Sequence, residues 1–471
     1  MIFLTTLFVL TRIFYYFLGL RFDASPLGVY NQYLDPLLLR NDLLRSLFYL
    51  REQPPGFNLV LGLFTKWSPF ELRHSFQAMF LLVGWASILS LYLLMRRLQV
   101  RPGIAIVMVS VFLAAPSTVL YENWLFYAYP VLFLLNLAAL QLHRFLTGFK
   151  IVDGAIFFGA LALTSSFHSM FHLFWFLLFL LMLLLLVQTH WKKVAIAALV
   201  PASLLIAISA KNLILFGDWT PGRQVYQTTN AAILTSQLTP ASVIDKLIAE
   251  GKVTRILKMS IYHHVPDDYR DLVQQPALTG VPALDESIKS TGAVNWNSVW
   301  MARIGLLYNK DAITLNHFYP QGSIKSRWAN LATYFFPAEN VDPFTNTGYR
   351  NMIVLKPIFR WYDYLVSGQS QRQGPPWLSW LIVGSCLLFG IYVILQWTIR
   401  GLKGRSYWSD PSSIVVLFLM FNILYTATVS IILSHGDQNR YRNAVSGQYL
   451  ILFALLINSL PIGKLEKTKI A

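Results

Sequence analysis

The sequence predicts an all-α polytopic membrane protein with about ten transmembrane helices. Of the 471 residues, 55% are hydrophobic and only 13% are charged, whereas soluble domains carry roughly 25% charged residues. The mean hydropathy is +0.50, and apolar stretches long enough to cross about 30 Å of hydrocarbon recur along the chain. These observations exclude a string of soluble domains. The single cysteine, Cys386, excludes a disulfide framework.

The apolar stretches form two groups, one before and one after a long polar region. Each is close to the roughly 20 residues that a membrane-spanning helix needs. Arg12 lies within the first stretch and argues against a cleaved signal peptide, so we expect that helix to be retained. In order, the stretches are Ile2–Leu20, Phe76–Met95, Ile104–Leu120, Leu125–Leu142, Ile151–Phe167, Phe171–Gln188, Val194–Phe216, Trp377–Ile399, Ile414–Leu433 and Val445–Pro461.

Basic residues follow every second predicted span, which places those segments and both termini on the cytoplasmic side. The formal net charge of +16 is therefore explained mainly by orientation in the membrane, and no nucleic-acid partner is expected. The basic groups are Arg96, Arg97 and Arg101; Arg144 and Lys150; Lys192 and Lys193; Arg400, Lys403 and Arg405; and Lys464, Lys467 and Lys469.

Two long polar segments then fall on the extracytoplasmic face. The first, 21–75, belongs to a transmembrane module over 1–216 and contains Phe57–Phe64, an apolar run that is too short to span and predicts an interfacial helix. The second, 217–376, is too long for an ordinary loop and predicts a small domain of mixed structure or an elaborate lid. Residues 377–471 form the C-terminal transmembrane module.

No Asn-x-Ser/Thr site occurs in the chain. Long extracytoplasmic segments without one glycosylation acceptor favour a bacterial plasma (inner) membrane over the membrane of the endoplasmic reticulum, which is the alternative.

The first extracytoplasmic segment offers carboxylates beside the membrane. Asp23 lies about three residues beyond the first span, where a partly desolvated carboxylate either keeps its charge through basic or hydrogen-bonding neighbours or serves as a candidate general base. A solvated interfacial aspartate next to Arg21 is the alternative interpretation. Asp35 and Asp42 follow in the same segment.

This region resembles the C-type (GT-C) fold of membrane glycosyltransferases, in the branch of the protein mannosyltransferases and aminoarabinose transferases. The resemblance depends on Arg12 in the first helix, an acid just outside the membrane, the Gln-x-Leu-Asp-x-x-Leu-Leu spacing of 32–39, the Pro54-Pro55-x-aromatic element and the helix that follows Glu71. It is clearest over the first hundred residues. It implies transfer of a sugar from a polyprenyl-phosphate donor to an extracytoplasmic acceptor, with inversion at the anomeric carbon.

The resemblance also implies roles for individual residues. Asp23 matches the catalytic base and is preferred over Asp35, but Asp35 and Asp42 both stay open as alternatives because Ala24 stands where the family often has a second acid. Glu122 matches the acid that helps to bind the acceptor, whereas the alternative is an acid stabilised at a helix end by the helix dipole. Gln53 stands before the Pro-Pro pair, where the family tends to have histidine, and is expected to bind the acceptor.

Two histidines and a lysine lie at the outer ends of later spans. His168 and His172 flank one turn, where they can bind substrate, hold a metal ion as a pair or pack at the interface. Lys211 lies within the outer half of the seventh span, where a cation at mid-bilayer costs roughly 2.5–3.5 kcal/mol. The donor phosphate is its expected partner, and snorkelling to headgroups is the alternative.

Arg440 and Arg442 lie outside the membrane just before the last span, against the positive-inside bias. The family commonly carries an Asn-Arg-aromatic-Arg run here, close to the donor phosphate. A salt bridge with Asp437 is the alternative. In the second segment, Asn295-Trp296-Asn297 and Tyr319-Pro320 resemble elements of related transferases and are candidates for an acceptor cleft.

We therefore expect an inverting glycosyltransferase that uses a polyprenyl-phosphate sugar and a lipid, glycan or protein acceptor. A transporter or flippase of a lipid-linked saccharide is the second interpretation, although the paired broken helices typical of transporters are not visible in the sequence. No organic cofactor is expected, and dependence on a divalent metal stays open.

Overall fold

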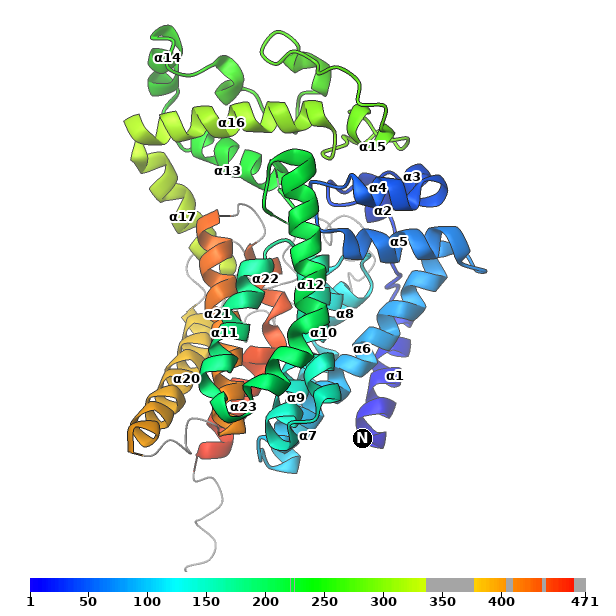
Figure 1. Cartoon of the computed structure of the whole chain (residues 1–471), viewed down its shortest axis with the longest axis vertical. Coiled ribbons are helices and arrows are strands. Elements are labelled where there is room, and N and C mark those ends of the chain that lie inside the picture. The colour runs from blue at the N-terminus through cyan, green and yellow to red at the C-terminus, as the bar shows by residue number, and fades with distance from the viewer. Residues whose placement is uncertain (221, 224, 336–376, 404–409, 434–437, 461–471) are drawn as a thin grey trace, which may run out of the picture.

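The computed structural model describes residues 1–220, 222–223, 225–335, 377–403, 410–433 and 438–460. It shows an all-α protein with two parts. One part is a bundle of long apolar helices. The other, here called the outward unit, comprises the described residues of 217–335 and lies at one end of the bundle, which is called the outer end below (Figure 1). In the described part of the chain, extended pairing is limited to two isolated bridges, Asp23 with Trp124 and Ile288 with Val294.

The bundle contains helices from both ends of the chain. Five of them, α6, α9, α12, α20 and α21, are long and apolar enough to cross a membrane, and five others are shorter apolar helices. The prediction of an all-α membrane protein is thereby confirmed. The bundle helices are α1 (Ile2–Phe17), α6 (Leu72–Arg97), α7 (Pro102–Ala114), α8 (Pro116–Glu122), α9 (Ala128–Gly148), α10 (Ile151–Phe167), α11 (Leu173–Leu186), α12 (Trp191–Phe216), α20 (Trp377–Lys403), α21 (Pro411–Leu433), α22 (Gln438–Ala444) and α23 (Ser446–Ser459).

The third predicted stretch was expected as one helix, but the structure divides it at Pro116. Helix α7 ends at Ala114, Ala115 has an extended backbone with ψ of 133°, and α8 begins at Pro116. The residue before proline is disfavoured in the helical conformation, and proline has no N–H for the preceding turn. The break directs α8 so that its last residue, Glu122, is only 1% exposed.

Helix α9 lies at the centre of the bundle and is buried on most of its surface. Small residues allow close packing around it and its neighbours. A Cβ atom on Gly154 of α10 would lie 2.9 Å from Ala197 of α12 and 2.9 Å from the ring of Phe145 in α9. Without a hydrophobic driving force between helices in lipid, such close contacts supply much of the association energy.

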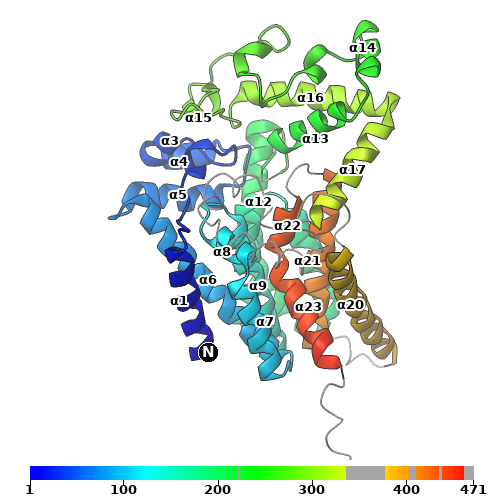
Figure 2. The ribbon, with the colours of Figure 1, turned by 180° about the vertical axis from the view of Figure 1, so that it is seen from behind.

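The first polar segment forms four helices at the outer end of the bundle: α2 (Pro26–Val29), α3 (Pro36–Asn41), α4 (Leu43–Phe48) and α5 (Pro55–Trp67). Both views show them side by side, next to the outward unit (Figures 1 and 2). Proline opens α2, α3 and α5, where its missing N–H costs no helical hydrogen bond. The predicted interfacial run lies within α5, which is longer than expected.

The outward unit has a hydrophobic core of its own, which includes Ile256, Trp300, Tyr308 and Leu315. It was expected to be of mixed structure, but its described part is helical and has no named strand. The reason is that α16 buries one face along its whole length, and the shorter elements cover that face. Its helices are α13 (Val225–Gln237), α14 (Ala241–Ala249), α15 (Pro282–Asp285), α16 (Val299–Phe318) and α17 (Pro320–Tyr334), with 3₁₀ turns at Arg255–Lys258 and Pro266–Tyr269.

Candidate functional site

Asp23 is held against the turn between α8 and α9. Its N–H donates to the carbonyl of Asn123 (2.8 Å), and its carbonyl accepts from the N–H of Leu125 (2.9 Å), so that Asp23 pairs with Trp124. Its side chain is half-buried, and Oδ1 accepts a hydrogen bond from the N–H of Ser25 at 2.9 Å. The first segment therefore places this carboxylate at a fixed position at the outer end of the bundle.

The same turn carries an aromatic strip that supports a cation. The rings of Trp124 and Phe126 stack with centroids 4.4 Å apart, and Tyr30 meets both rings edge-on at 5.7 Å. Cζ of Arg440, from α22, lies 4.8 Å from the centroid of the Phe126 ring. A guanidinium over an aromatic face is a favourable cation–π arrangement. The candidate base and the candidate phosphate-binding cation thus both contact residues 123–126.

Arg442 is placed differently from Arg440. It is 8% exposed, and its Nη1 donates to the carbonyl of Phe335 at 3.4 Å. Phe335 is the C-cap of α17, where a cation is favoured by the helix dipole. The structure therefore joins Arg442 to the end of α17. Asp437, its alternative partner, lies outside the described residues.

His168 lies in the wall of the same region. Its ring is 4.7 Å from that of Tyr127 and 5.6 Å from that of Tyr441, and Nδ1 accepts from the N–H of Met170 at 3.1 Å. Burial and the nearby Arg440 guanidinium lower the pKa of His168 to about 3. The ring is therefore neutral near pH 7, with its proton on Nε2 as a hydrogen-bond donor.

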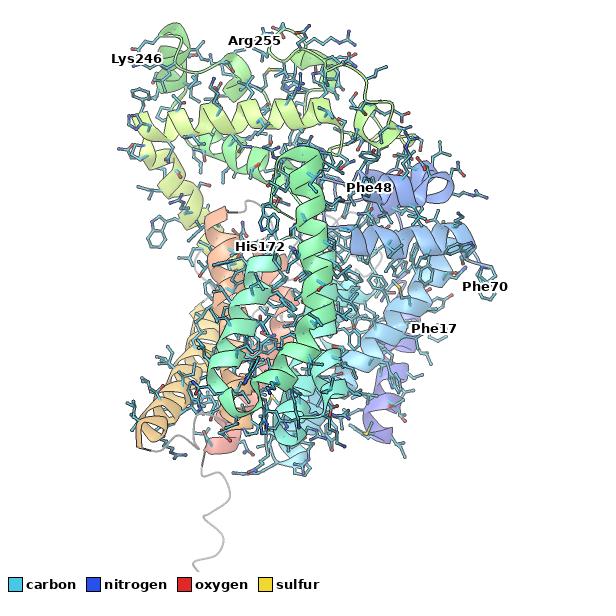
Figure 3. All side chains as sticks on the ribbon, in the orientation of Figure 1. Phe17, Phe48, Phe70, His172, Lys246 and Arg255 are labelled. Atoms are coloured by element: carbon cyan, nitrogen blue, oxygen red, sulfur yellow. The ribbon has the colours of Figure 1, made fainter. Side chains whose placement is uncertain are left out.

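His172 and Gln53 lie at the same turn between α10 and α11. Nδ1 of His172 accepts from the N–H of Phe174 and caps α11, at whose outer end it lies (Figure 3). Gln53 is 3% exposed, and its Oε1 accepts from the hydroxyl of Ser169 at 3.1 Å. Gln53 thus contacts the turn that carries His168. Among the described residues no group of three His, Cys, Asp or Glu side chains is placed to hold a metal ion.

Glu122 forms a buried ion pair with Arg12. Both carboxylate oxygens accept at 2.8 Å from the guanidinium, and Tyr129 donates to Oε2 at 2.8 Å. A Cβ atom on Gly84 would lie 2.2 Å from Oε2, so the glycine makes room for this network. Glu122 ends α8, where the helix dipole disfavours a carboxylate, so Arg12 rather than the dipole stabilises it.

Asp35 uses both oxygens to join the first segment to the outward unit. Oδ1 caps α3 by accepting from the N–H of Leu37 (2.8 Å) and also accepts from the hydroxyl of Ser290 (2.5 Å), while Oδ2 accepts from the N–H of Ser290 (2.5 Å). Lys289 strengthens the junction by donating to the carbonyl of Tyr30 at 2.6 Å. This geometry favours Asp23 over Asp35 as a general base.

Lys211 contacts the first segment. Its Nζ donates to the carbonyl of Phe48, the last residue of α4 (2.8 Å), and to the carbonyl of Leu50 just beyond the helix (3.0 Å). Figure 3 shows Phe48 beside the outer end of α12, which carries Lys211. The ammonium group thus caps α4, a role that the two sequence-based interpretations did not include.

Glu52 and Asn297 also join the first segment to the outward unit, a role that the sequence did not predict for either residue. Glu52 is 1% exposed and accepts from the N–H groups of Val225 (2.9 Å) and Tyr226 (3.0 Å), which open α13. Burial raises its pKa to about 8. Asn297 accepts from the N–H of Arg51 at 2.7 Å, and the Asn295-Trp296-Asn297 motif was the one signal that pointed to this position.

A groove of about 350 Å³ lies between α1 and α6 beside this site. Arg12, Gln77 and Asn123 supply polar atoms, and residues such as Tyr15 and Leu81 supply apolar ones. Because Asn123 also binds the backbone of Asp23, the groove ends next to the candidate base.

No protein-family model, curated protein or solved structure matches the chain. The site must therefore be interpreted from its own geometry.

Proposed function

We propose that the chain is an inverting glycosyltransferase that moves a sugar from a polyprenyl-phosphate donor to an acceptor on the extracytoplasmic face of the membrane. The observation that carries the proposal is that Asp23 and Arg440, from two distant segments, both contact one aromatic turn, 123–126, at the outer end of the bundle. A carboxylate and a guanidinium against the same turn suit a proton transfer and an anionic leaving group.

In the proposed reaction, the Asp23 carboxylate removes the proton from an acceptor hydroxyl or amine. The acceptor atom forms a bond to the anomeric carbon while the bond from that carbon to the phosphate oxygen breaks. The bonding electrons leave with the lipid phosphate, whose anion Arg440 stabilises. Attack opposite the leaving group inverts the anomeric carbon. The neutral Nε2–H of His168 supplies a further donor to substrate oxygens.

The membrane arrangement belongs to the same proposal. The chain crosses the membrane ten times in a C-type glycosyltransferase fold, with both termini cytoplasmic, in a bacterial plasma membrane. Two observations support the ten crossings: each of the ten predicted stretches overlaps an apolar helix, and the described parts of both polar segments lie at the same end of the bundle (Figure 1). The groove between α1 and α6 is suited to a lipid chain of a substrate beside Asp23.

The test is an assay of purified protein in detergent with a polyprenyl-phosphate sugar and candidate acceptors. We expect Asp23→Asn to lower kcat by about 10²–10⁴-fold, as for loss of a general base. Asp42→Asn is the matched control because Asp42 is a half-buried aspartate of the same segment that makes no side-chain capping bond.

Full transfer by the Asp23→Asn variant would refute the assignment of the base. In liposomes, movement of the donor lipid without cleavage of its sugar would support the transporter interpretation instead.

A further inference from the structure

We infer a second binding site in the outward unit: a pocket for a single sugar ring that carries a negatively charged group. The pocket lies between α13, α16 and α17, next to the outer end of α21, and has a volume of about 220 Å³. None of the described residues that line it belongs to the first segment or to α22. The inference goes beyond the proposed transferase function and does not depend on it.

Neutral hydrogen-bonding side chains line the pocket together with three alanines and two isoleucines. Helices α13 and α16 share the core of the outward unit, and α17 packs against both of them, so the relative positions of these groups are fixed by packing. Hydroxyl and amide groups both donate and accept, which is the chemistry that matches the hydroxyl groups of a sugar. The neutral hydrogen-bonding residues are Thr228, Thr235, Asn309, Asn316, Ser323, Ser326 and Asn330.

Several of these groups have no hydrogen bond with another described residue. Oδ1 of Asn316 is buried and accepts no hydrogen bond from the described part of the chain. A buried amide oxygen without a partner costs free energy, so a ligand that donates to it is stabilised. The hydroxyls of Ser323 and Ser326 line the same pocket and likewise make no hydrogen bond to a described residue.

One cation stands at the pocket. Arg327 lies four residues after Ser323, on the same face of α17. It is exposed, and within the described ranges it forms no ion pair. No aspartate or glutamate is among the described lining residues. A guanidinium binds a carboxylate or a phosphate with two parallel hydrogen bonds, which is why we infer a charged group on the sugar.

The volume limits the ligand. Pockets for drug-sized molecules measure roughly 300–1,000 Å³, so a pocket of about 220 Å³ suits one sugar ring better than an oligosaccharide. A bare inorganic anion would use Arg327 but would leave the amide of Asn316 and the hydroxyls without partners.

The experiment measures binding to the full chain in detergent without any donor lipid, so its outcome is separate from that of the transfer assay. The probes are the methyl glycosides of a hexuronic acid and of a neutral hexose, and binding is followed by saturation-transfer NMR and calorimetry. We expect the hexuronide to bind about three- to fivefold more tightly, since an exposed ion pair contributes modestly. Arg327→Gln should remove this preference. Lys325→Gln, a neighbouring exposed cation that does not line the pocket, should retain it.

A second variant tests the sugar ring itself. Asn316→Leu should weaken both glycosides at least fivefold, whereas His317→Leu, on the exposed side of α16, should leave both unchanged. The inference is overturned if neither glycoside binds saturably, or if Lys325→Gln acts like Arg327→Gln. It is also overturned if inorganic phosphate or phosphatidylglycerol displaces the hexuronide and binds equally well to the Asn316→Leu variant, since the pocket would then be an anion or headgroup site.

Discussion

At the scale of single residues, ionisable groups in the bundle are stabilised by specific partners. Arg12 and Glu122 are 110 positions apart, yet they form two hydrogen bonds of 2.8 Å deep in the protein. A buried pair adds little net stability relative to apolar residues, but removing one partner leaves an uncompensated charge. Because both carboxylate oxygens of Glu122 bind Arg12, Glu122 has a structural role that must be separated by experiment from acceptor binding.

We expect Glu122→Gln to destabilise the protein by about 3–5 kcal/mol, because it leaves Arg12 buried without a counter-charge. The double variant Arg12→Met, Glu122→Met should recover most of this loss, since both charges are removed. Thermal unfolding in detergent measures the effect. A double variant that is no more stable than Glu122→Gln would contradict the argument. A double variant that is stable but inactive in transfer would assign Glu122 to the acceptor.

At the scale of elements, polar side chains join the first segment to its neighbours by binding main-chain groups, mostly near helix ends. Lys211 caps α4, Asp35 binds the N–H of Ser290, and Glu52 binds the first N–H groups of α13. Because helix ends carry unsatisfied main-chain groups, these contacts fix the position of the segment that carries Asp23.

Lys211→Met should lower stability and leave the KM for the donor unchanged within about twofold. The substitution removes two hydrogen bonds from an ammonium group, each worth about 1.5–3 kcal/mol at most. Lys211→Arg, which keeps the charge and the donors, is the control. Thermal unfolding and donor titration are measured together. A large rise in KM with unchanged unfolding temperature would favour the donor-phosphate interpretation.

Glu52 makes the junction with the outward unit dependent on pH. Burial raises its pKa in the folded protein to about 8, from an ordinary value of 4.5, even though the N–H groups of Tyr226 and Val225 and the nearby Arg51 and Arg223 favour the charged form. Between about pH 4.5 and pH 8, Glu52 therefore keeps its proton in the folded state and has lost it in the unfolded state. Stability should fall as the pH rises through this window and level off above it.

Glu52→Gln should flatten this dependence, because glutamine resembles the protonated acid. The measurement is the unfolding temperature in detergent between pH 5 and 9, where each kcal/mol corresponds to about 2–4 °C in a chain of moderate size. Glu250→Gln, which changes an exposed carboxylate of the same unit, is the control. Identical slopes for Glu52→Gln and the parent protein would contradict the argument.

The helices of the bundle were predictable from sequence because length and apolar composition decide them locally. Ile151–Phe167 was predicted with the bounds of α10, and the break at Pro116 follows from the chemistry of proline. The candidate site residues could be named one by one from the sequence, but their contacts with one another could not be predicted. The bond between Asn297 and the backbone of Arg51 joins positions 246 residues apart, and no local pattern predicts which distant groups will meet.

At the scale of the whole molecule, two hydrophobic cores are present. One core fills the bundle and includes Val281, Ala283 and Leu284 of the outward unit, and the other fills the rest of that unit. The hydrogen bonds of Asp35, Glu52 and Asn297 add polar contacts where the two parts meet. In Figure 3, Lys246 and Arg255 lie on the outward unit, far from the end of the bundle at which α1 begins. The chain thus has a polar end and an opposite end bearing basic turns. This asymmetry is what the positive-inside rule requires of an oriented membrane protein.

The orientation leads to a prediction for the whole chain that needs no substrate. Cys386 is fully buried, so Cys386→Ser gives a background without thiols in which single cysteines can be introduced. Lys246→Cys on α14 should react with a membrane-impermeant maleimide in spheroplasts, because that face is extracytoplasmic in the ten-span arrangement. Lys192→Cys, at the exposed start of α12, should react only after the membrane is permeabilised.

Reaction at Lys192→Cys in intact spheroplasts, or protection at Lys246→Cys, would show that the outward unit faces the cytoplasm. The proposed extracytoplasmic site would then be on the wrong side of the membrane, whatever the transfer assay gives.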